Sequence, residues 1–269
     1  MTPEIVGARI VEQREVARAT WWLVVEIDAP EAPEVPEGFG PGHVVALYVP
    51  DPEGKWIRHP YTVSWSEGRR LAFLYRVIRG GRTTPFMSLM GAGETVRLGG
   101  RFGLPISALV PDDAPAVVCV STGSGIGPLH GYAREALAAA HGTPGAGRPI
   151  TLLAGFREAV DIPQGPALDA LAASHPRFTW HPTLTRPAPG WTGRAGRVSA
   201  HLGSVATADA HWHLVGNGAM VIDVRAGLLG AGVAPERITT ETYFNRGTSP
   251  DPRVVEAIVA GIGKVRGGG

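Results

Sequence analysis

The stretch over residues 117–128, which reads Val-Val-Cys-Val-Ser-Thr-Gly-Ser-Gly-Ile-Gly-Pro, decides the fold of this chain. An apolar run over residues 116–120 stops at a glycine-rich turn, and a segment of helical character follows over residues 129–140. A strand, a tight glycine turn and a helix bring backbone N–H groups up to a phosphate, because glycine has no side chain to block the approach. The same pattern is also that of an ordinary strand-to-helix turn without a ligand.

Composition limits the classes of protein to consider. The 269 residues, 44% of them hydrophobic, suffice for two ordinary domains. A formal net charge of +1 gives no general electrostatic reason to bind nucleic acid or an anionic membrane. The single cysteine, Cys119, excludes a disulfide framework and a cysteine-ligated iron–sulfur cluster, and its apolar surroundings indicate a core thiol. No apolar run reaches ~18 residues and no secretory signal is evident, so we expect no membrane span and a cytoplasmic protein.

The first hundred residues carry six short segments rich in β-branched and aromatic residues, with turn signals between them. They cover residues 5–16, 21–28, 43–49, 56–65, 71–78 and 94–98, with one short helix at 84–90. This spacing predicts a six-stranded antiparallel β-barrel over residues 1–109.

The pattern changes after a linker rich in proline and aspartate at residues 105–115. Strands expected at 117–120, 150–154, 178–184, 212–215 and 238–243 alternate with helices at 129–140, 166–173 and 220–229. This alternation predicts a Rossmann-like domain with a parallel sheet over residues 110–244, and ligands at the carboxyl ends of its strands. Residues 245–269 form a C-terminal tail with one helix at 252–262.

Three motifs in the first half resemble those of the ferredoxin–NADP reductase family of flavoproteins, of the bacterial type without an iron–sulfur domain. Arg58-His-Pro-Tyr61-Thr62 resembles that family's Arg-x-Tyr-Ser flavin motif, with one residue inserted and threonine in place of serine. Residues 80–84, Gly-Gly-Arg-Thr-Thr, resemble its Gly-Gly-x-x-Ser phosphate turn, and residues 99–103 are similar to its Gly-Pro-Phe-Gly turn.

Three further motifs follow in family order. Residues 122–128 resemble the nicotinamide loop Gly-Thr-Gly-Ile-Ala-Pro, residues 216–220 the Cys-Gly-x-x-x-Met motif, and residues 241–244 the Glu-x-Tyr ending. The likeness covers about residues 5–244. It implies a barrel that binds FAD, followed by a domain that binds a nicotinamide nucleotide.

The resemblance implies a flavin site on the barrel. An arginine can pair with the pyrophosphate, a tyrosine can pack on the isoalloxazine ring, and a hydroxyl at Thr62 can hydrogen-bond flavin N5. The implied flavin-binding residues are Arg58, Pro60, Tyr61, Thr62, Gly81, Thr83 and Thr84. Without the resemblance, these residues read as an exposed arginine beside a core tyrosine. His59 is expected at the protein surface or at the edge of the cofactor.

The implied nucleotide site lies in the second domain. Its residues are Thr122, Gly123, Gly125, Pro128, Arg157, Thr185, Arg186, Arg197, Gly216 and Met220. The arginines suit the 2′-phosphate of NADP(H), so we prefer that nucleotide. Glu158 after the second strand could instead bind a ribose 2′-hydroxyl, which leaves NAD(H) as an alternative.

The site at the nicotinamide ring departs from the family at Val215, where a cysteine is common. Glu241 matches a carboxylate that positions the nicotinamide or supplies a proton, while Tyr243 and Phe244 match aromatic residues that cover the flavin. Together with Thr62, Glu241 and Tyr243 are the candidate catalytic residues. The structural alternative is that Glu241 forms a salt bridge and that Tyr243 and Phe244 are aromatic residues of the core. We expect no metal site: two histidines at 211 and 213 have no evident third ligand.

The expected activity is hydride transfer from NADPH to FAD and then passage of single electrons to ferredoxin, flavodoxin or another redox protein, or the reverse. One alternative is an NAD(P)H-dependent reductase subunit of a larger oxygenase or redox complex, with residues 245–269 as a docking segment. Another is a flavin- or nucleotide-binding module without catalytic activity. The acceptor, the direction of electron flow and the oligomeric state are left open.

Overall fold

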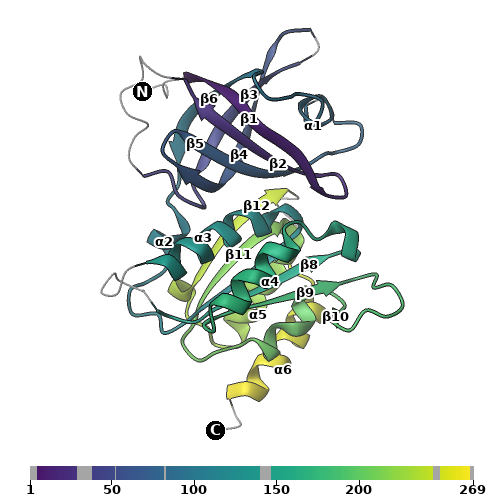
Figure 1. The fold of residues 1–269 in the computed structure, drawn as a ribbon. Coiled ribbons are helices and arrows are strands. Elements are labelled where there is room, and N and C mark those ends of the chain that lie inside the picture. Colours follow the sequence, from purple (N-terminus) through teal and green to yellow (C-terminus); the bar gives the residue numbers. More distant parts are fainter. Residues whose placement is uncertain are drawn as a thin grey trace. The chain divides into compact units, whose positions relative to one another are not determined.

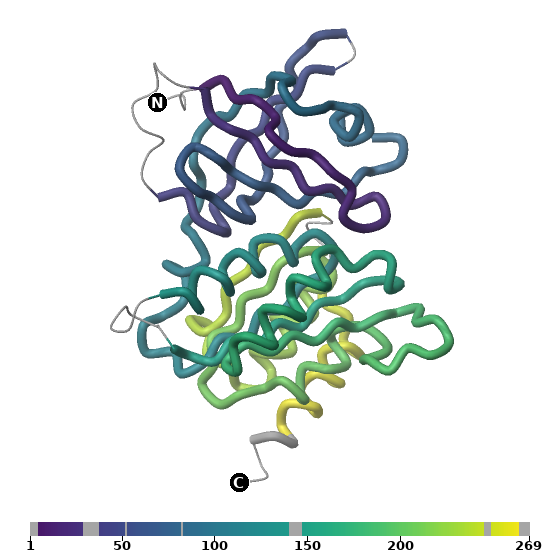
Figure 2. Tube along the Cα trace, viewed as in Figure 1, coloured from purple at the N-terminus to yellow at the C-terminus, as the bar shows by residue number. Residues whose placement is uncertain are grey.

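The computed structural model describes residues 5–28, 38–51, 53–81, 83–139, 147–244 and 249–266. The chain divides into two compact units. One consists of Met1–Ala108 with Gly127–Tyr132, and the other of Leu109–Ile126 with Ala133–Gly269. The strands of the first unit are purple to blue in Figures 1 and 2, and those of the second are teal to yellow.

The first unit is a closed six-stranded barrel in the order β1-β2-β5-β4-β3-β6, and every neighbouring pair is antiparallel. Its strands are β1 (Ile5–Ala17), β2 (Thr20–Ile27), β3 (Val44–Pro50), β4 (Trp56–Glu67), β5 (Arg70–Arg76) and β6 (Thr95–Phe102). The barrel predicted from the sequence is therefore confirmed.

Alternation of side chains along these strands fills the barrel. Val45, Leu47 and Val49 of β3 are fully buried in its core, as β-strand geometry requires of every second residue. The short helix α1 (Thr84–Met87) adds Met87 to the same core. Burial of each such side chain contributes about 1.5–3 kcal/mol, so the barrel is a rigid support for the loops that join its strands.

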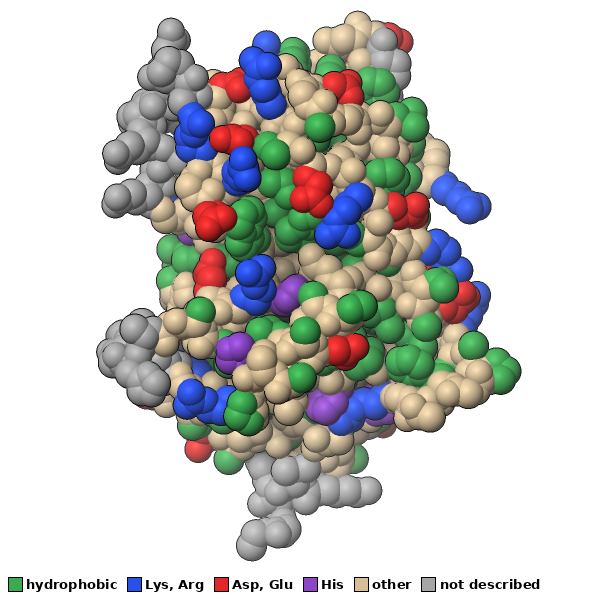
Figure 3. Space-filling view, viewed as in Figure 1, with side chains coloured by type: hydrophobic (Ala, Val, Ile, Leu, Met, Phe, Trp, Pro, Cys, Tyr) green, Lys and Arg blue, Asp and Glu red, His purple; other side chains and the backbone are tan. Residues whose placement is uncertain are grey.

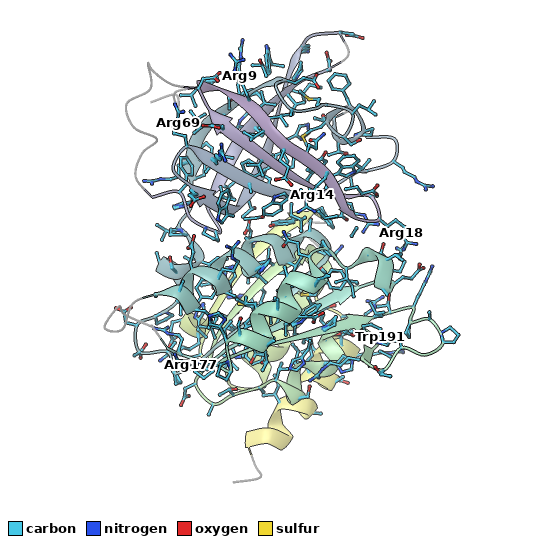
Figure 4. The ribbon with its side chains drawn as sticks, in the orientation of Figure 1. Arg9, Arg14, Arg18, Arg69, Arg177 and Trp191 are labelled. Atoms are coloured by element: carbon cyan, nitrogen blue, oxygen red, sulfur yellow. The ribbon has the colours of Figure 1, made fainter. Side chains whose placement is uncertain are left out.

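The outer surface of the barrel unit carries mixed charge. Arg9 lies 3.1 Å from Asp28, and Glu26 pairs with Arg69 and Arg70 at 3.3 and 3.2 Å. Figure 3 shows basic and acidic side chains interspersed on the face it displays, and Figure 4 labels Arg9 and Arg69. Such exposed pairs are worth little individually, and they form no surface of a single sign.

The second unit is built on a six-stranded sheet in the order β10-β9-β8-β7-β11-β12, in which every pair is parallel. Its strands are β7 (Val117–Thr122), β8 (Ile150–Phe156), β9 (Phe178–Leu184), β10 (Arg194–Ala195), β11 (His211–Asn217) and β12 (Ile238–Phe244). The parallel sheet is confirmed, with β10 as a two-residue strand that the sequence analysis did not predict.

Helices and 3-10 turns connect these strands. The α-helices are α2 (Ile106–Leu109), α3 (Ile126–Ala138), α4 (Gly165–Ser174), α5 (Gly218–Gly230) and α6 (Pro252–Arg266). The 3-10 turns are η1 (Gly123–Gly125), η2 (Ala159–Asp161), η3 (Val198–Ser204) and η4 (Pro235–Arg237). Helix α3 begins three residues earlier than predicted because η1 runs directly into it, and α2 occupies part of the predicted linker.

The tail helix belongs to the core of the second unit. Ile258 and Ile262 of α6 are buried with residues of α5, η3 and the sheet. A Cβ atom at Gly227 of α5 would lie 2.6 Å from the Cβ of Ile258, so glycine is what allows α6 to pack this closely. The sequence pattern had predicted this helix as part of a tail outside the domain. Residues 245–248 and 267–269 of the tail lie outside the described residues.

Among the described residues, no helix has both the length and the apolar character needed to span a membrane.

Candidate cofactor sites

A cavity of about 620 Å³ opens on the barrel unit between the start of β4 and the segment over residues 78–84. It is lined by Asp51, Lys55, Trp56, Ile57, Arg58, His59, Ile78, Gly81, Thr83 and Thr84. Four of the seven residues assigned to flavin binding from the sequence therefore line one cavity. Arg82, the central residue of the predicted phosphate turn, lies outside the described residues.

The predicted phosphate turn is held by its own hydrogen bonds. The backbone N–H of Ile78 donates to Thr84 Oγ1 at 2.9 Å, and the N–H of Gly81 donates to the carbonyl of Ile78, also at 2.9 Å. Thr83 is only 6% exposed, and its Oγ1 lies 2.8 Å from Nε2 of His59. Gly81, Thr83 and Thr84 of the turn thus lie at the cavity wall, with their positions held by these hydrogen bonds.

Strand β4 has no bulge against β3 within the predicted flavin motif. Its pairing with β3 is unbroken from Trp56 opposite Pro50 to Thr62 opposite Val44. Because successive strand residues point to opposite faces, Arg58 and Tyr61 lie on different faces of β4. The extra residue of the motif is thus part of the regular strand, and only a bulge would have brought Arg58 and Tyr61 to one face.

Tyr61 packs against the barrel core. Its ring centroid is 6.2 Å from that of Phe73 and 6.3 Å from that of Tyr75, both in edge-to-face geometry. Burial raises the pKa of its phenol well above the ordinary value, so the hydroxyl stays protonated and can donate a hydrogen bond.

Arg58, Pro60 and Thr62 lie on the other face of β4. Arg58 is exposed, and its guanidinium carbon lies 5.9 Å from the centre of the Phe102 ring. Pro60 is also exposed, and Thr62 is half-buried opposite Val44. A cation above an aromatic face gains a modest attraction, so Arg58 has a local partner.

In the second unit, the strand order reverses between β7 and β11, because β8 and β9 lie on one side of β7 and β12 lies beyond β11. Ligands of open α/β sheets bind outside the carboxyl ends of the strands at such a switch point. Thr122 ends β7, and Gly216 and Asn217 end β11. Asn217 donates from its N–H to Thr122 Oγ1 at 3.0 Å, and its side chain caps α5 by accepting from the N–H of Ala219 at 3.0 Å.

Two glycines allow the two strand ends to approach this closely. Gly216 has φ +132°, and a Cβ there would lie 2.9 Å from the carbonyl oxygen of Thr122. A Cβ at Gly125 would lie 2.8 Å from the carbonyl oxygen of Val215. The structure therefore brings together Thr122, Gly125 and Gly216, and Gly123 lies between the first two with φ +57°.

Pro128 and Met220 support the helices that follow the two strand ends. Pro128 is buried in the first turn of α3, where a missing N–H costs nothing. Met220 is half-buried in the first turn of α5 and packs against the core of the sheet.

The residues predicted to contact the 2′-phosphate gather at the carboxyl ends of β8 and β9. The N–H of Arg186 donates to the carbonyl of Arg157 at 2.8 Å, and that of Thr185 to the carbonyl of Phe156 at 3.0 Å. The N–H of Gly196 donates to the carbonyl of Leu184 at 2.8 Å, which brings Arg197 to the same edge. The side chains of Arg157, Thr185, Arg186 and Arg197 are all exposed.

The loop between β9 and β10 carries Trp191, labelled in Figure 4. Its indole N–H donates to the carbonyl of Arg194 at 3.1 Å. This bond fixes the loop beside the exposed arginines.

Glu158, the residue that kept NAD(H) as an alternative, has a structural role. It caps η2 in a capping box: its side chain accepts from the backbone N–H of Asp161, and its own N–H donates to Asp161 Oδ2 at 3.1 Å. Its carboxylate is thereby turned toward its own chain.

The predicted residues of the nicotinamide face lie on β12, next to the end of β11. Glu241 pairs with Val215 and Phe244 with Asn217 across the two strands. Val215 is fully buried and also pairs with Ser121 of β7. Glu241 and Tyr243 are half-buried, and Phe244 is 50% exposed. This part of the predicted site therefore adjoins the switch point.

His211 and His213 both contact the hydroxyl of Thr239. Their ring nitrogens Nε2 and Nδ1 lie 2.8 and 2.7 Å from Thr239 Oγ1. Burial lowers their pKa values to about 4 and about 3, with Arg237 and Arg148 adding to the shift at His211 and the other imidazole adding to it at His213. Among the described residues, no group of three or more histidine, cysteine or acidic side chains could hold a metal ion.

Cys119 is buried in β7, and burial raises the pKa of its thiol to about 12. A thiol of this kind is a packing residue and no nucleophile.

The sequence signals at two residues of these sites were stronger than the use made of them. Asn217 carries a signal that could have found it, since asparagine before a glycine-led helix is a favoured N-cap. His59 lies two residues before Tyr61 and hence on the same strand face, which strand periodicity alone could have shown.

Comparison with known proteins agrees with this geometry. Residues 119–226 match the family model "Oxidoreductase NAD-binding domain". A protein named ferredoxin–NADP reductase B, from Sorangium cellulosum, is 31% identical over 61% of this chain and 65% of its own length. The reductase component of a naphthalene 1,2-dioxygenase system, from Pseudomonas putida, is 26% identical over 79% of this chain and 62% of its own length. The chain thus spans less than two thirds of these relatives.

Among solved structures, a ferredoxin NADP+ reductase from Neisseria gonorrhoeae with bound FAD and NADP superposes with a TM-score of 0.74. The two are 21% identical, and the superposition covers 89% of this chain and 99% of that one. At this identity the likeness concerns the fold. The barrel, the parallel sheet with its glycine turn at the switch point, and these relatives make the chain similar to oxidoreductases of the ferredoxin–NADP reductase type.

Proposed function

We propose that this chain binds FAD on its barrel and NADP(H) on its parallel sheet, and that it passes the reducing equivalents of NADPH to a one-electron acceptor protein. The observation that carries the proposal is the switch point between β7 and β11, where Gly125 and Gly216 leave no room for a side chain. Backbone N–H groups exposed at such a turn suit a pyrophosphate. The names of the Sorangium relative and of the Neisseria structure support the same assignment.

On the barrel, Tyr61, Thr62 and Pro60 would hold the isoalloxazine side of the flavin. Arg58, Gly81, Thr83 and Thr84 would hold its phosphates in the 620 Å³ cavity, and the family resemblance favours FAD over FMN. The flavin, when bound, supplies the conversion between two-electron and one-electron chemistry. The protein supplies position: the Tyr61 hydroxyl stays protonated, and Thr62 offers a hydroxyl for N5.

We propose NADP(H) rather than NAD(H). Arg186 and Arg197 are exposed at the carboxyl end of β9, where planar guanidinium groups can receive a 2′-phosphate. Thr185 and Arg157 adjoin them. Glu158, the residue that would favour NAD(H), is engaged in the capping box of η2.

At the nicotinamide, Glu241 and Tyr243 would position the ring or supply a proton, and Phe244 would cover a cofactor ring. Valine at 215 removes the thiol common in the family. Hydride transfer needs no thiol, so we expect valine to alter the packing of the ring without abolishing the reaction.

Ferredoxin or flavodoxin is the acceptor we propose. A second candidate, the reductase component of an oxygenase system, is favoured by the Pseudomonas relative.

The test is acceptor selectivity. With saturating NADPH, the purified chain should reduce cytochrome c much faster when ferredoxin or flavodoxin is added than without either carrier. Equal rates with and without carriers would contradict the proposed partner, while stimulation only by an oxygenase component would favour the second candidate.

A further inference from the structure

We propose that Gln13 of β1 is a positioning residue of the flavin site, because its side-chain amide holds helix α1 where Thr83 and Thr84 reach the barrel cavity. The inference rests on the proposed function, since a flavin phosphate is the ligand that these two threonines would meet. Gln13 itself is not among the residues that line the cavity.

The amide of Gln13 uses both of its N–H groups and its oxygen. Nε2 donates to the carbonyl oxygens of Met87 at 2.8 Å and Met90 at 2.6 Å, and Oε1 lies 3.3 Å from the hydroxyl of Tyr75, which donates to it. The last carbonyls of a helix have no partner within the helix, so they need donors from elsewhere. A primary amide supplies two donors and one acceptor, which is the set that these three partners require.

The peptide groups of α1 connect Gln13 to the cavity wall. The N–H of Met87 donates to the carbonyl of Thr83 at 2.8 Å, and the carbonyl of Met87 accepts from Gln13. The N–H of Ser88 donates in the same way to the carbonyl of Thr84 at 3.0 Å. Thr83 and Thr84 line the cavity, so a single hydrogen-bonded turn separates them from the amide of Gln13.

The segment that carries these residues has few other polar contacts with the barrel. Within its described parts, residues 78–81 and 83–90, the hydrogen bonds to other parts of the chain come from the side chains of Gln13 and His59. Met87 is fully buried in the barrel core and adds apolar contacts. Apolar contacts have no direction, so we assign the orientation of the turn at this end to Gln13.

Strand pairing explains why Gln13 points toward α1. Gln13 lies opposite Leu23 of β2, which is buried in the barrel core. Its neighbours Glu12 and Arg14 are exposed on the other face of β1. The uncharged amide therefore stands on the inner face, where a carboxylate would meet the carbonyl oxygens at the end of α1.

The experiment compares Gln13→Met with the wild type in the full-length chain, freed of flavin and titrated by fluorescence quenching. The ligands are FAD and, separately, riboflavin, which has no phosphate. Methionine keeps the length of the side chain and removes all three hydrogen bonds, so two buried carbonyls lose a partner. We expect FAD to bind about tenfold more weakly and the affinity for riboflavin to change less than about twofold.

Hydrogen exchange gives a second measurement that does not depend on flavin. The amides of residues 83–90 should exchange faster in Gln13→Met, while those of β2 should exchange as in the wild type. Arg14→Met is the matched control for both measurements, since Arg14 is exposed on the other face of the same strand and is labelled in Figure 4. It should change neither flavin affinity nor the exchange of residues 83–90.

Equal losses for FAD and riboflavin in Gln13→Met would show that Gln13 only supports the barrel. Unchanged FAD affinity, or unchanged exchange of residues 83–90, would show that α1 is held without it. Each of these results overturns the inference and leaves the flavin site in place, whereas a wild-type chain that bound neither flavin would contradict the proposed function itself. Should Gln13→Met not fold, as judged by its melting curve, Gln13→Glu keeps the volume and the acceptor for Tyr75 but cannot donate to two carbonyls, and it should also weaken FAD more than riboflavin.

Discussion

The candidate site of the barrel unit is formed mainly by side chains, whereas that of the parallel sheet is formed mainly by backbone. On the barrel, the site is a cavity walled by side chains, some of them fixed to one another, as in the contact of His59 with Thr83. On the parallel sheet, the site is backbone: Gly125 and Gly216 bring two strand ends together, and the arginines beside them are exposed.

The difference matches two kinds of ligand. A walled cavity with preset donors loses little side-chain entropy on binding and suits a group that stays bound through many turnovers. A backbone turn with exposed arginines suits a nucleotide that must arrive and leave in every cycle. The comparison predicts that substitutions on the sheet change the kinetics of NADPH, whereas those on the barrel change flavin retention.

The largest effect is expected at Gly216. Gly216→Ala places a methyl group against the backbone of Thr122, so the turn must open and kcat/KM for NADPH should fall by at least about 100-fold. Flavin content should stay near that of the wild type, because the proposed flavin site lies on the barrel. Steady-state kinetics and the flavin absorbance of the same preparation measure both quantities.

Gly123→Ala is the matched control for that substitution. Gly123 also has a positive φ, +57°, yet nothing lies within 4 Å of the added Cβ. Backbone strain alone costs about 1 kcal/mol there, so a loss of about fivefold is expected. Equal losses in the two variants would mean that the close approach of the strand ends does not matter for the nucleotide.

The next effect is nucleotide preference. Replacing both Arg186 and Arg197 by alanine should raise KM for NADPH about tenfold or more and change KM for NADH less than about threefold. Arg177→Ala is the control, since Arg177 is an exposed arginine just before the amino end of β9 and is labelled in Figure 4. If both nucleotides were affected alike, the arginines would not contact the 2′-phosphate.

A smaller effect concerns the stability of the sheet against acid. His211 and His213 have pKa values of about 4 and about 3 in the folded chain, against 6.5 when unfolded. Below pH 6.5 the unfolded chain binds protons that the folded chain does not, so stability is full above that pH and falls as the pH drops toward 4. The expected slope is about 1.4 kcal/mol per pH unit for each histidine.

His213→Gln should flatten this dependence, measured as melting temperature between pH 7 and about pH 4.5. His201→Gln, a histidine of η3 in the same unit, serves as the control and should keep the wild-type slope. The same slope in wild type and His213→Gln would show that the buried pair does not govern acid stability.

The smallest effect is expected at Glu158. Loss of its capping box in Glu158→Ala should reduce the free energy of unfolding by about 1 kcal/mol and leave the preference between NADPH and NADH unchanged. Val160→Ala, at a 59% exposed position of the same turn, should change neither. A selective rise in KM for NADH in Glu158→Ala would instead assign this carboxylate to a ribose.

The sequence predicted most of the architecture, since period-two strands and one glycine turn are local signals. It missed features that depend on three-dimensional neighbours. The sequence showed Ile258 and Ile262 only as the apolar face of a separate tail helix. In the structure they belong to the core of the second unit, where Ile258 packs against Gly227 of α5. The motif was aligned on Arg58 and Tyr61 as one site, whereas the pairing of β4 puts these two side chains on opposite faces of the strand.

The most direct test is an anaerobic titration of the purified, flavin-loaded protein with NADPH, followed at about 450 nm, where bound flavin absorbs. We predict a yellow protein whose band is lost on addition of one equivalent of NADPH per flavin, with a slower loss on NADH. A colourless protein that FAD does not reconstitute, or a yellow protein whose band persists with excess NADPH, would contradict the account.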